Sequence, residues 1–174
     1  MNALSVFTFI RCWMRNLVPV ATTFAFVLVG QLPLPLPLLS NVAPAFALIS
    51  LYYWVVFRPD LMPYVAVFGL GIVQDAVAGA PLGMYALVYL LVQALVLNQR
   101  RFIVGKPFWV FWSAFALVAP IAAFAVWLLA SVARGTLLAP GTAFVALIMT
   151  IVLFPAIAWL LVRTQRHLIG IAEA

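Results

Sequence analysis

Charged side chains are scarce in this sequence of 174 residues: they make up only 7% of it, as nine Lys or Arg and three Asp or Glu. Soluble domains carry about 25% charged and about 45–50% apolar residues, whereas 68% of this chain is hydrophobic. So few charges cannot cover a water-facing surface, which excludes a soluble globular fold. The apolar residues form continuous runs, unlike the two-residue alternation of a membrane β-barrel. The composition therefore predicts an all-α membrane protein.

Residues that perform enzyme chemistry are also few. The only acids are Asp60, Asp75 and Glu173, and His167 and Cys12 are the only residues of their kinds. A metal site needs three or four converging ligands, an aspartyl protease needs two paired carboxylates, and a serine protease needs a base that His167 in the tail cannot supply. No nucleotide-binding Gly-Lys-Ser/Thr loop is present, and a single cysteine excludes an intrachain disulfide. We expect no catalysis, no metal and no cofactor.

Six apolar runs predict one transmembrane domain over residues 1–174, built as a six-helix bundle. The expected spans cover about 17–32, 42–57, 61–77, 82–97, 108–130 and 143–162. A straight span needs about 20 residues, so the shorter runs are marginal and five spans are the alternative, with the third and fourth runs the first candidates for a broken pair. The first run reads as an uncleaved span, followed at Pro33–Pro37 by prolines that exclude helix.

The basic residues predict the orientation of this bundle. With six spans, one side receives Arg11, Arg15, Arg58, Arg100, Arg101, Lys106, Arg163 and Arg166, and the other side receives only Arg134. Positive residues mark the cytoplasmic side, so we expect both termini in the cytoplasm. Because these residues lie in short clusters between apolar runs, we expect no nucleic-acid partner.

Two features at the predicted cytoplasmic side allow more than one interpretation. The basic loop with Arg100, Arg101 and Lys106 either only sets topology or also touches anionic lipid or a cytoplasmic partner. The aromatic residues 52–54, just before Arg58, suit an interfacial belt, and packing inside the bundle is the alternative.

Asp75 is the one acid within a predicted span. A carboxylate at mid-membrane costs about 2.5–3.5 kcal/mol, so we expect it to face protein or water. Gly71 and Gly79 lie four residues before and after it, on one helical face where small residues let another backbone approach. The stretch Gly79–Gly83 then breaks the helix, and free amides at the start of the next helix suit the carboxylate. Asp75 is therefore either a cap that holds the fold or a contact to a partner or substrate.

The pattern Gly71-x-x-x-Asp75-x-x-x-Gly79-x-Pro81-Leu82-Gly83, in a small six-span protein, resembles the MreD family of rod-shape-determining membrane proteins. Other matching features are a basic loop after the fourth span, a proline in the last span and a basic tail: Arg100, Arg101, Pro155, Arg163 and Arg166. The short tail and the Pro33–Pro37 repeat depart from the family and leave the first extracytoplasmic loop uninterpreted.

The resemblance implies a non-catalytic scaffold subunit of the cell-elongation complex in the bacterial inner membrane. It implies an MreC-type bitopic partner and, indirectly, the MreB filament, the RodA glycosyltransferase and a penicillin-binding transpeptidase of lateral peptidoglycan synthesis. It also implies a fold like that of the substrate-binding components of energy-coupling-factor vitamin transporters. That fold supplies the alternative function, a membrane component that binds a small molecule for transport, although few polar residues lie within the predicted spans.

Overall fold

A computed structural model describes residues 17–31, 44–137 and 139–168. The Pro33–Pro37 loop, Arg11, Cys12, Arg15 and Glu173 lie outside these residues, and the side chains of Arg166 and His167 are not described. The described chain contains six α-helices and no strand, which confirms the all-α fold class. The helices are an N-terminal helix Leu17–Val29, α2 (Phe46–Phe57), α3 (Tyr64–Ala78), α4 (Met84–Ile103), α5 (Phe108–Arg134) and α6 (Pro140–Leu168), with a short 3-10 turn η1 (Pro59–Leu61) between α2 and α3.

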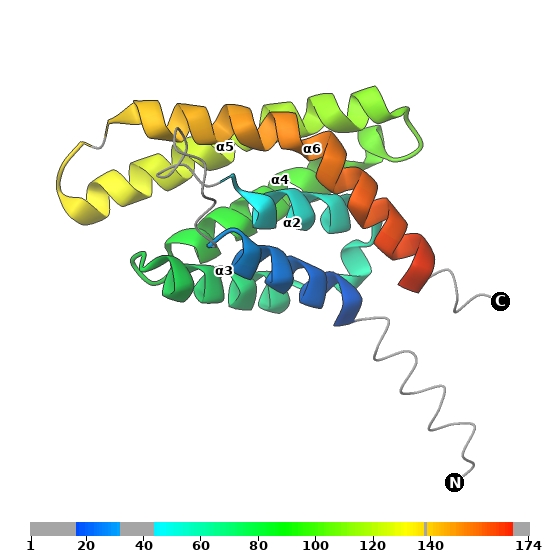
Figure 1. The fold of residues 1–174 in the computed structure, drawn as a ribbon, viewed down its shortest axis with the longest axis horizontal. Coiled ribbons are helices and arrows are strands. Elements are labelled where there is room, and N and C mark those ends of the chain that lie inside the picture. The colour runs from blue at the N-terminus through cyan, green and yellow to red at the C-terminus, as the bar shows by residue number, and fades with distance from the viewer. Residues whose placement is uncertain (1–16, 32–43, 138, 169–174) are drawn as a thin grey trace, which may run out of the picture.

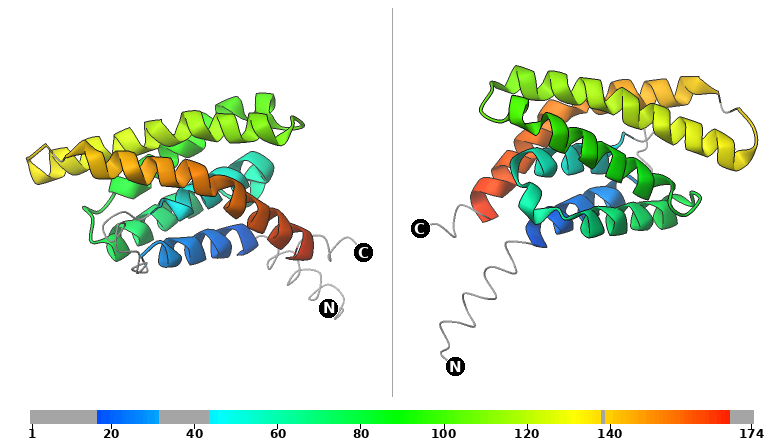
Figure 2. Two further views of the ribbon diagram at one scale, coloured as in Figure 1. Left: turned by 45° about the horizontal axis from the view of Figure 1, so that its top comes forward. Right: turned by 180° about the vertical axis from the view of Figure 1, so that it is seen from behind.

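The helices form three layers (Figure 1). The long helices α5 and α6 form one outer layer, the N-terminal helix and α3 form the other, and α2 and α4 lie between them (Figure 2). Contacts join α3 to α4, α4 to α5, α5 to α6, and α2 to both α4 and α6. The sequence neighbours α3 and α4 therefore form an antiparallel hairpin that connects an outer layer to the middle layer.

The central helix α2 is apolar on every face, and such a helix must be surrounded by protein or lipid on all sides. Every residue from Ala47 to Val56 is buried. Tyr52 and Trp54 are fully buried and donate hydrogen bonds to other helices: the Tyr52 hydroxyl to the Phe111 carbonyl at 3.1 Å, and the Trp54 indole to Thr22 Oγ1 at 2.9 Å. The interfacial-belt interpretation of residues 52–54 is therefore wrong, and packing inside the bundle is correct.

Helix length divides the bundle into two groups. Only α4, α5 and α6 are long and apolar enough to cross a membrane, by length and composition, among the described helices. The 12 residues of α2 extend about 18 Å at 1.5 Å per residue, well short of a hydrocarbon core of about 30 Å. That the three shorter helices also span the membrane, which would make six spans in total, therefore stays a prediction.

Helix boundaries differ from the predicted spans where polar residues continue a helix. α4 was expected to end near Leu97 but continues through Arg100 to Ile103, and α6 extends beyond its predicted span at both ends. A span predicted from hydropathy ends at the first polar residues, whereas a helix ends only where the backbone leaves the helical conformation. α5 ends at Gly135, which has a φ of 64° in the left-handed region that glycine adopts without steric cost.

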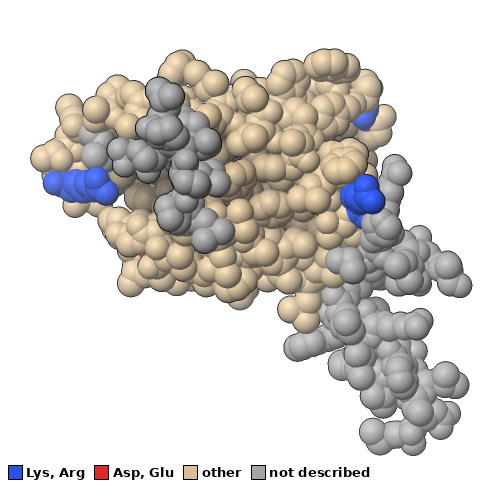
Figure 3. Space-filling model, viewed as in Figure 1, with Lys and Arg blue, Asp and Glu red and all other residues tan. Residues whose placement is uncertain are grey.

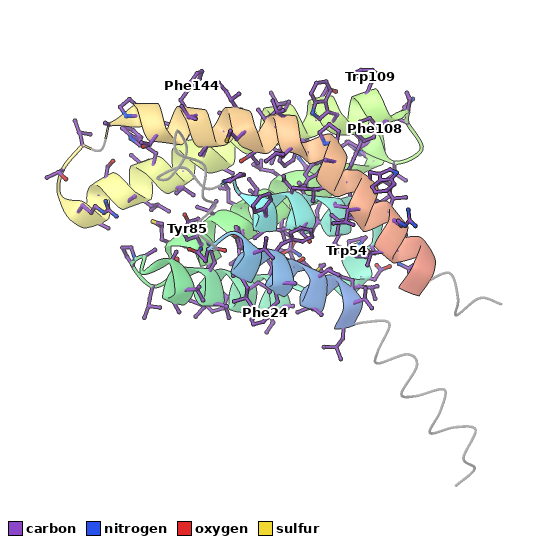
Figure 4. The ribbon with its side chains drawn as sticks, in the orientation of Figure 1. Phe24, Trp54, Tyr85, Phe108, Trp109 and Phe144 are labelled. Atoms are coloured by element: carbon purple, nitrogen blue, oxygen red, sulfur yellow. The ribbon has the colours of Figure 1, made fainter. Side chains whose placement is uncertain are left out.

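The aromatic cluster between α2, α5 and α6 gives a test of this packing. Phe154 is fully buried and stacks on Phe115 with ring centroids 4.2 Å apart. Since lipid is as apolar as the core, its loss removes packing rather than burial from water. We expect Phe154→Ala to lower the free energy of unfolding by roughly 3 kcal/mol, measured by reversible unfolding in mixed detergent. Phe144→Ala is the control, because Phe144 on the same helix is 62% exposed and points away from the bundle (Figure 4); equal losses would contradict the packing.

Candidate functional site

The backbone of Asp75 closes helix α3. Gly79 follows the last helical residue with a φ of 63°, and its N–H donates to the Asp75 carbonyl. The N–H of Ala80 donates to the same carbonyl at 3.0 Å. This six-to-one bond is the mark of a Schellman end, which needs a left-handed residue and therefore favours glycine. The helix thus ends where the sequence predicted a break, and its closing hydrogen bonds go to the carbonyl of the acidic residue.

The side chain of Asp75 begins helix α4. Its Oδ2 accepts the Gly83 N–H and its Oδ1 accepts the Tyr85 N–H, both at 2.8 Å, and the residue has no exposed surface. The first amides of a helix lack partners within it and carry the positive end of its dipole. A buried anion at this place satisfies two amides and is itself stabilised by them. Asp75 therefore joins the end of one helix to the start of the next.

Close approach of the two helices occurs at Gly71. A Cβ added there would lie against the Ala86 Cα and 2.6 Å from its nitrogen, so only a residue without a side chain fits. Small residues let helix backbones approach in this way. Sequence reasoning predicted the approach at Gly71 but missed Ala86 and Tyr85 as its counterparts. The small side chain of Ala86, three residues after Gly83, was the available signal.

The other residues of the motif form the turn rather than a packing face. A Cβ on Gly79 or Gly83 would meet nothing within 4 Å, but both have positive φ, 63° and 96°. The expectation that Gly79 admits another backbone is therefore wrong, because its role is conformational. Pro81 and Leu82 lie at the exposed tip of the turn, where Leu82 is 76% exposed. Of the six motif residues, Asp75 thus binds the start of α4, Gly71 forms the close contact between the helices, and the other four form the turn.

The predicted basic loop is largely the last turn of α4. Arg100 and Arg101 are helical, and only Lys106 lies in the turn before α5. The Arg100 Nε donates to the Val56 carbonyl at 2.8 Å, at the end of α2 where free carbonyls favour a cation. The guanidinium of Arg101 lies 4.8 Å from the centroid of the Phe102 ring. The prediction of a loop is therefore wrong for Arg100 and Arg101, and Arg100 holds two helices together.

On the face of the described residues that Figure 3 shows, basic side chains lie at the two ends of the molecule. Arg58 directly follows α2, and the Arg100 bond places the end of α4 beside it. α6 reaches the same region, since the Tyr53 hydroxyl donates to Gln165 Oε1 at 2.6 Å. Arg134, in contrast, lies at the far end of α5. The described cations therefore divide unequally between the ends of the bundle.

The described acids do not form a reactive pair. Asp60 is exposed in η1 before α3, whereas Asp75 lies in the last turn of that helix. The 15 residues of α3 put about 22 Å between its ends, too far for two carboxylates to share a proton or a metal. Among the described residues, no three His, Cys, Asp or Glu side chains gather into a metal site. The arrangement around Asp75 is chemically that of a helix cap.

Replacing Asp75 tests the cap. Asp75→Asn removes the charge and one of the two acceptor oxygens, so one buried amide faces an NH2 group. Hydrogen bonds to a charged group contribute about 1.5–3 kcal/mol, and we expect a loss of roughly 2 kcal/mol in the free energy of unfolding. Asp60→Asn, at an exposed position, is the control and should change stability little. A stable Asp75→Asn protein would contradict the cap.

Two glycines of α3 test the close contact. Gly71→Ala forces α3 away from Ala86 and should lower the unfolding temperature clearly. Gly69→Ala is the matched control, because nothing lies within 4 Å of its added Cβ. In a helix interior, alanine is favoured over glycine by roughly 0.5–1 kcal/mol, so this variant should be neutral or slightly more stable. Thermal unfolding of both purified proteins in one detergent checks the difference, and equal stabilities would refute the contact.

Comparison with known proteins places this sequence in a family. No curated protein and no solved structure matches the chain, so the expected likeness to vitamin-transporter components stays a prediction. The model of the family described as "MreD: rod shape-determining protein MreD" matches residues 11–164. The match covers the Asp75 motif and all six helices except the end of α6. It confirms the resemblance: the chain belongs to the MreD family of rod-shape-determining membrane proteins.

Proposed function

We propose that this protein is a non-catalytic scaffold of the cell-elongation complex, acting with an MreC-type bitopic partner. The observation that carries the proposal is how the polar side chains are used. Asp75 binds amides of α4, Arg100 binds a carbonyl of α2, and Gln93 donates to the Met62 carbonyl at 2.8 Å. Each connects one element to the backbone of another. Side chains so engaged stabilise a rigid body rather than perform chemistry.

The burial of Asp75 restricts how a partner can bind. With no exposed surface and both oxygens accepting amides, the carboxylate is unavailable to another protein. A partner must therefore recognise the exposed faces of the helices or the turn at Pro81 and Leu82. The motif therefore contributes indirectly: it fixes the positions of α3 and α4, and these helices present the surface that a partner binds. Through the bitopic partner, we propose indirect connection to the MreB filament, RodA and a penicillin-binding transpeptidase.

The charge distribution supports an orientation with both termini in the cytoplasm of a multi-pass inner-membrane protein. The end of the bundle where α2 and α4 finish carries Arg58, Arg100 and Arg101, whereas the far end of α5 carries Arg134. Short cytoplasmic loops are enriched in basic residues. The more basic end therefore faces the cytoplasm in this proposal.

The alternative, a small-molecule-binding component of a transporter, is favoured by one observation. A cavity of about 470 Å³ lies between α4, α5 and α6 and is also lined by Leu48 of α2, within the size range of ligand sites. Its lining is mostly alanine and other apolar residues, which suits a polar vitamin poorly. Family membership favours the scaffold. A native mass spectrum with one polar metabolite bound per chain would reverse this ranking.

Depletion with complementation tests the scaffold proposal. In a rod-shaped host that depends on this protein, depletion should give rounded cells, and an MreC-type protein should co-purify with the wild-type chain. Since the contact at Gly71 organises the presenting helices, Gly71→Ala should restore neither rod shape nor co-purification, whereas Gly69→Ala should restore both. Membrane levels of each variant are measured by immunoblot. Normal rods after complete depletion, or an undiminished complex with Gly71→Ala, would contradict the proposal.

A further inference from the structure

The cavity between α4, α5 and α6 has a buried floor and an exposed rim. Its floor includes Val88, Ala119, Ala122 and Thr150, each no more than 2% exposed. Its rim includes Arg134 and Thr142, which are exposed. The cavity therefore opens at the end of the bundle opposite Arg100 and narrows into an apolar interior.

Two tyrosine hydroxyls in the cavity wall have no partner in the described chain. Tyr85 and Tyr89, one helical turn apart on α4, both line the cavity; Figure 4 shows Tyr85 at the start of that helix. Tyr89 is only 4% exposed, yet neither hydroxyl forms a hydrogen bond to a described residue. Other buried tyrosines here do, as Tyr52 does with the Phe111 carbonyl. Tyr89 is buried and Tyr85 is half-buried, so both hydroxyls are placed to hydrogen-bond to polar atoms of a ligand in the cavity.

The motif of the family positions this wall. The amide of Tyr85 is one of the two that Asp75 binds, so the buried carboxylate fixes the residue whose side chain faces the cavity. Gly71 lies against the next residue, Ala86. The motif thus sets both the α3–α4 contact and one wall of the cavity.

A second cavity suggests a way in from the bilayer. It measures about 350 Å³, is lined only by apolar residues, and shares Ala123, Trp127, Ala143 and Leu147 with the first. The α5 and α6 residues that line both come from the halves of these helices nearest their connecting turn, where the two helices diverge (Figure 1). Pro120 of α5 lines the second cavity, and proline within a helix removes a backbone bond. The two cavities therefore adjoin each other between these helices.

We propose that the alanine-lined cavity binds one anionic lipid with a phosphate headgroup, with its apolar chain between α4, α5 and α6 and its phosphate at Arg134. The alanine floor accepts a flexible chain, the tyrosine hydroxyls hydrogen-bond to ester or phosphate oxygens, and Arg134 supplies the positive charge. No described acid forms an ion pair with Arg134, so its charge is available to an anion. Both anionic glycerophospholipids and isoprenoid phosphates have this chemistry. The proposal does not depend on the scaffold function.

Photocrosslinking of the full chain in phosphatidylcholine nanodiscs tests this site. Three trace probes carry the same diazirine in an apolar chain: phosphatidylglycerol, an isoprenoid monophosphate, and phosphatidylcholine. At least one of the two anionic probes should label floor residues of α4 and α5 roughly threefold more than phosphatidylcholine does, as expected for one charge interaction. The more strongly labelling anionic probe identifies the source of the ligand. Equal labelling by all three, or labelling confined to lipid-facing residues, would overturn the proposal.

Two variants with matched controls locate the bound lipid. Ala146→Trp fills the cavity and should reduce floor labelling roughly tenfold, whereas Ala156→Trp, exposed on the same helix, should not. Arg134→Gln should abolish the preference for anionic probes, whereas Arg163→Gln should preserve it. If Ala146→Trp does not fold, the Arg134→Gln result decides by itself. Unchanged labelling in Ala146→Trp, or an unchanged preference in Arg134→Gln, would refute the site.

Discussion

The bond between the Asp75 carboxylate and the first amides of α4 is the constraint on which the bundle depends. A carboxylate in a low-dielectric interior is costly unless hydrogen bonds compensate it, and unpaired helix amides are costly for the same reason. Placing the two together satisfies both. Because the Asp75 carbonyl also ends α3, one residue fixes where two helices stop and start. The orientation of α4, and with it the contacts to α2 and α5, follows from this junction.

Other polar groups in the molecule likewise form hydrogen bonds between neighbouring elements. Arg100 binds the open carbonyl at the end of α2, Thr150 accepts the Ala45 amide just before that helix, and Trp112 donates to a carbonyl of α6. In an apolar medium the hydrophobic effect does not drive helices together, so packing and such bonds must do so. At one end of the bundle aromatic rings fill the space between α2, α5 and α6. At the other end alanines leave it open, and there the cavity lies.

Several features were predictable because they depend on local chemistry. Continuous apolar runs and twelve charges exclude a soluble fold whatever the tertiary arrangement. Gly79 and Pro81 break a helix through their own backbone preferences, and an acid four residues before the break suits the next helix start. The interpretation of residues 52–54 as an interfacial belt was wrong because the sequence of α2 does not determine what surrounds that helix. An apolar helix can be surrounded by lipid or by protein, and which of the two surrounds it depends on the helices packed against it.

The sequence by itself determined a helical membrane protein with one internal carboxylate beside a break, and the family to which that motif belongs. The tertiary structure alone decided that Asp75 is fully buried, that Ala86 meets Gly71, that Arg100 binds α2, and that a cavity opens between α4, α5 and α6. The physical reason is distance along the chain. Caps and turns depend on residues a few positions apart, whereas helix contacts and cavities depend on side chains brought together only by the packing of whole helices.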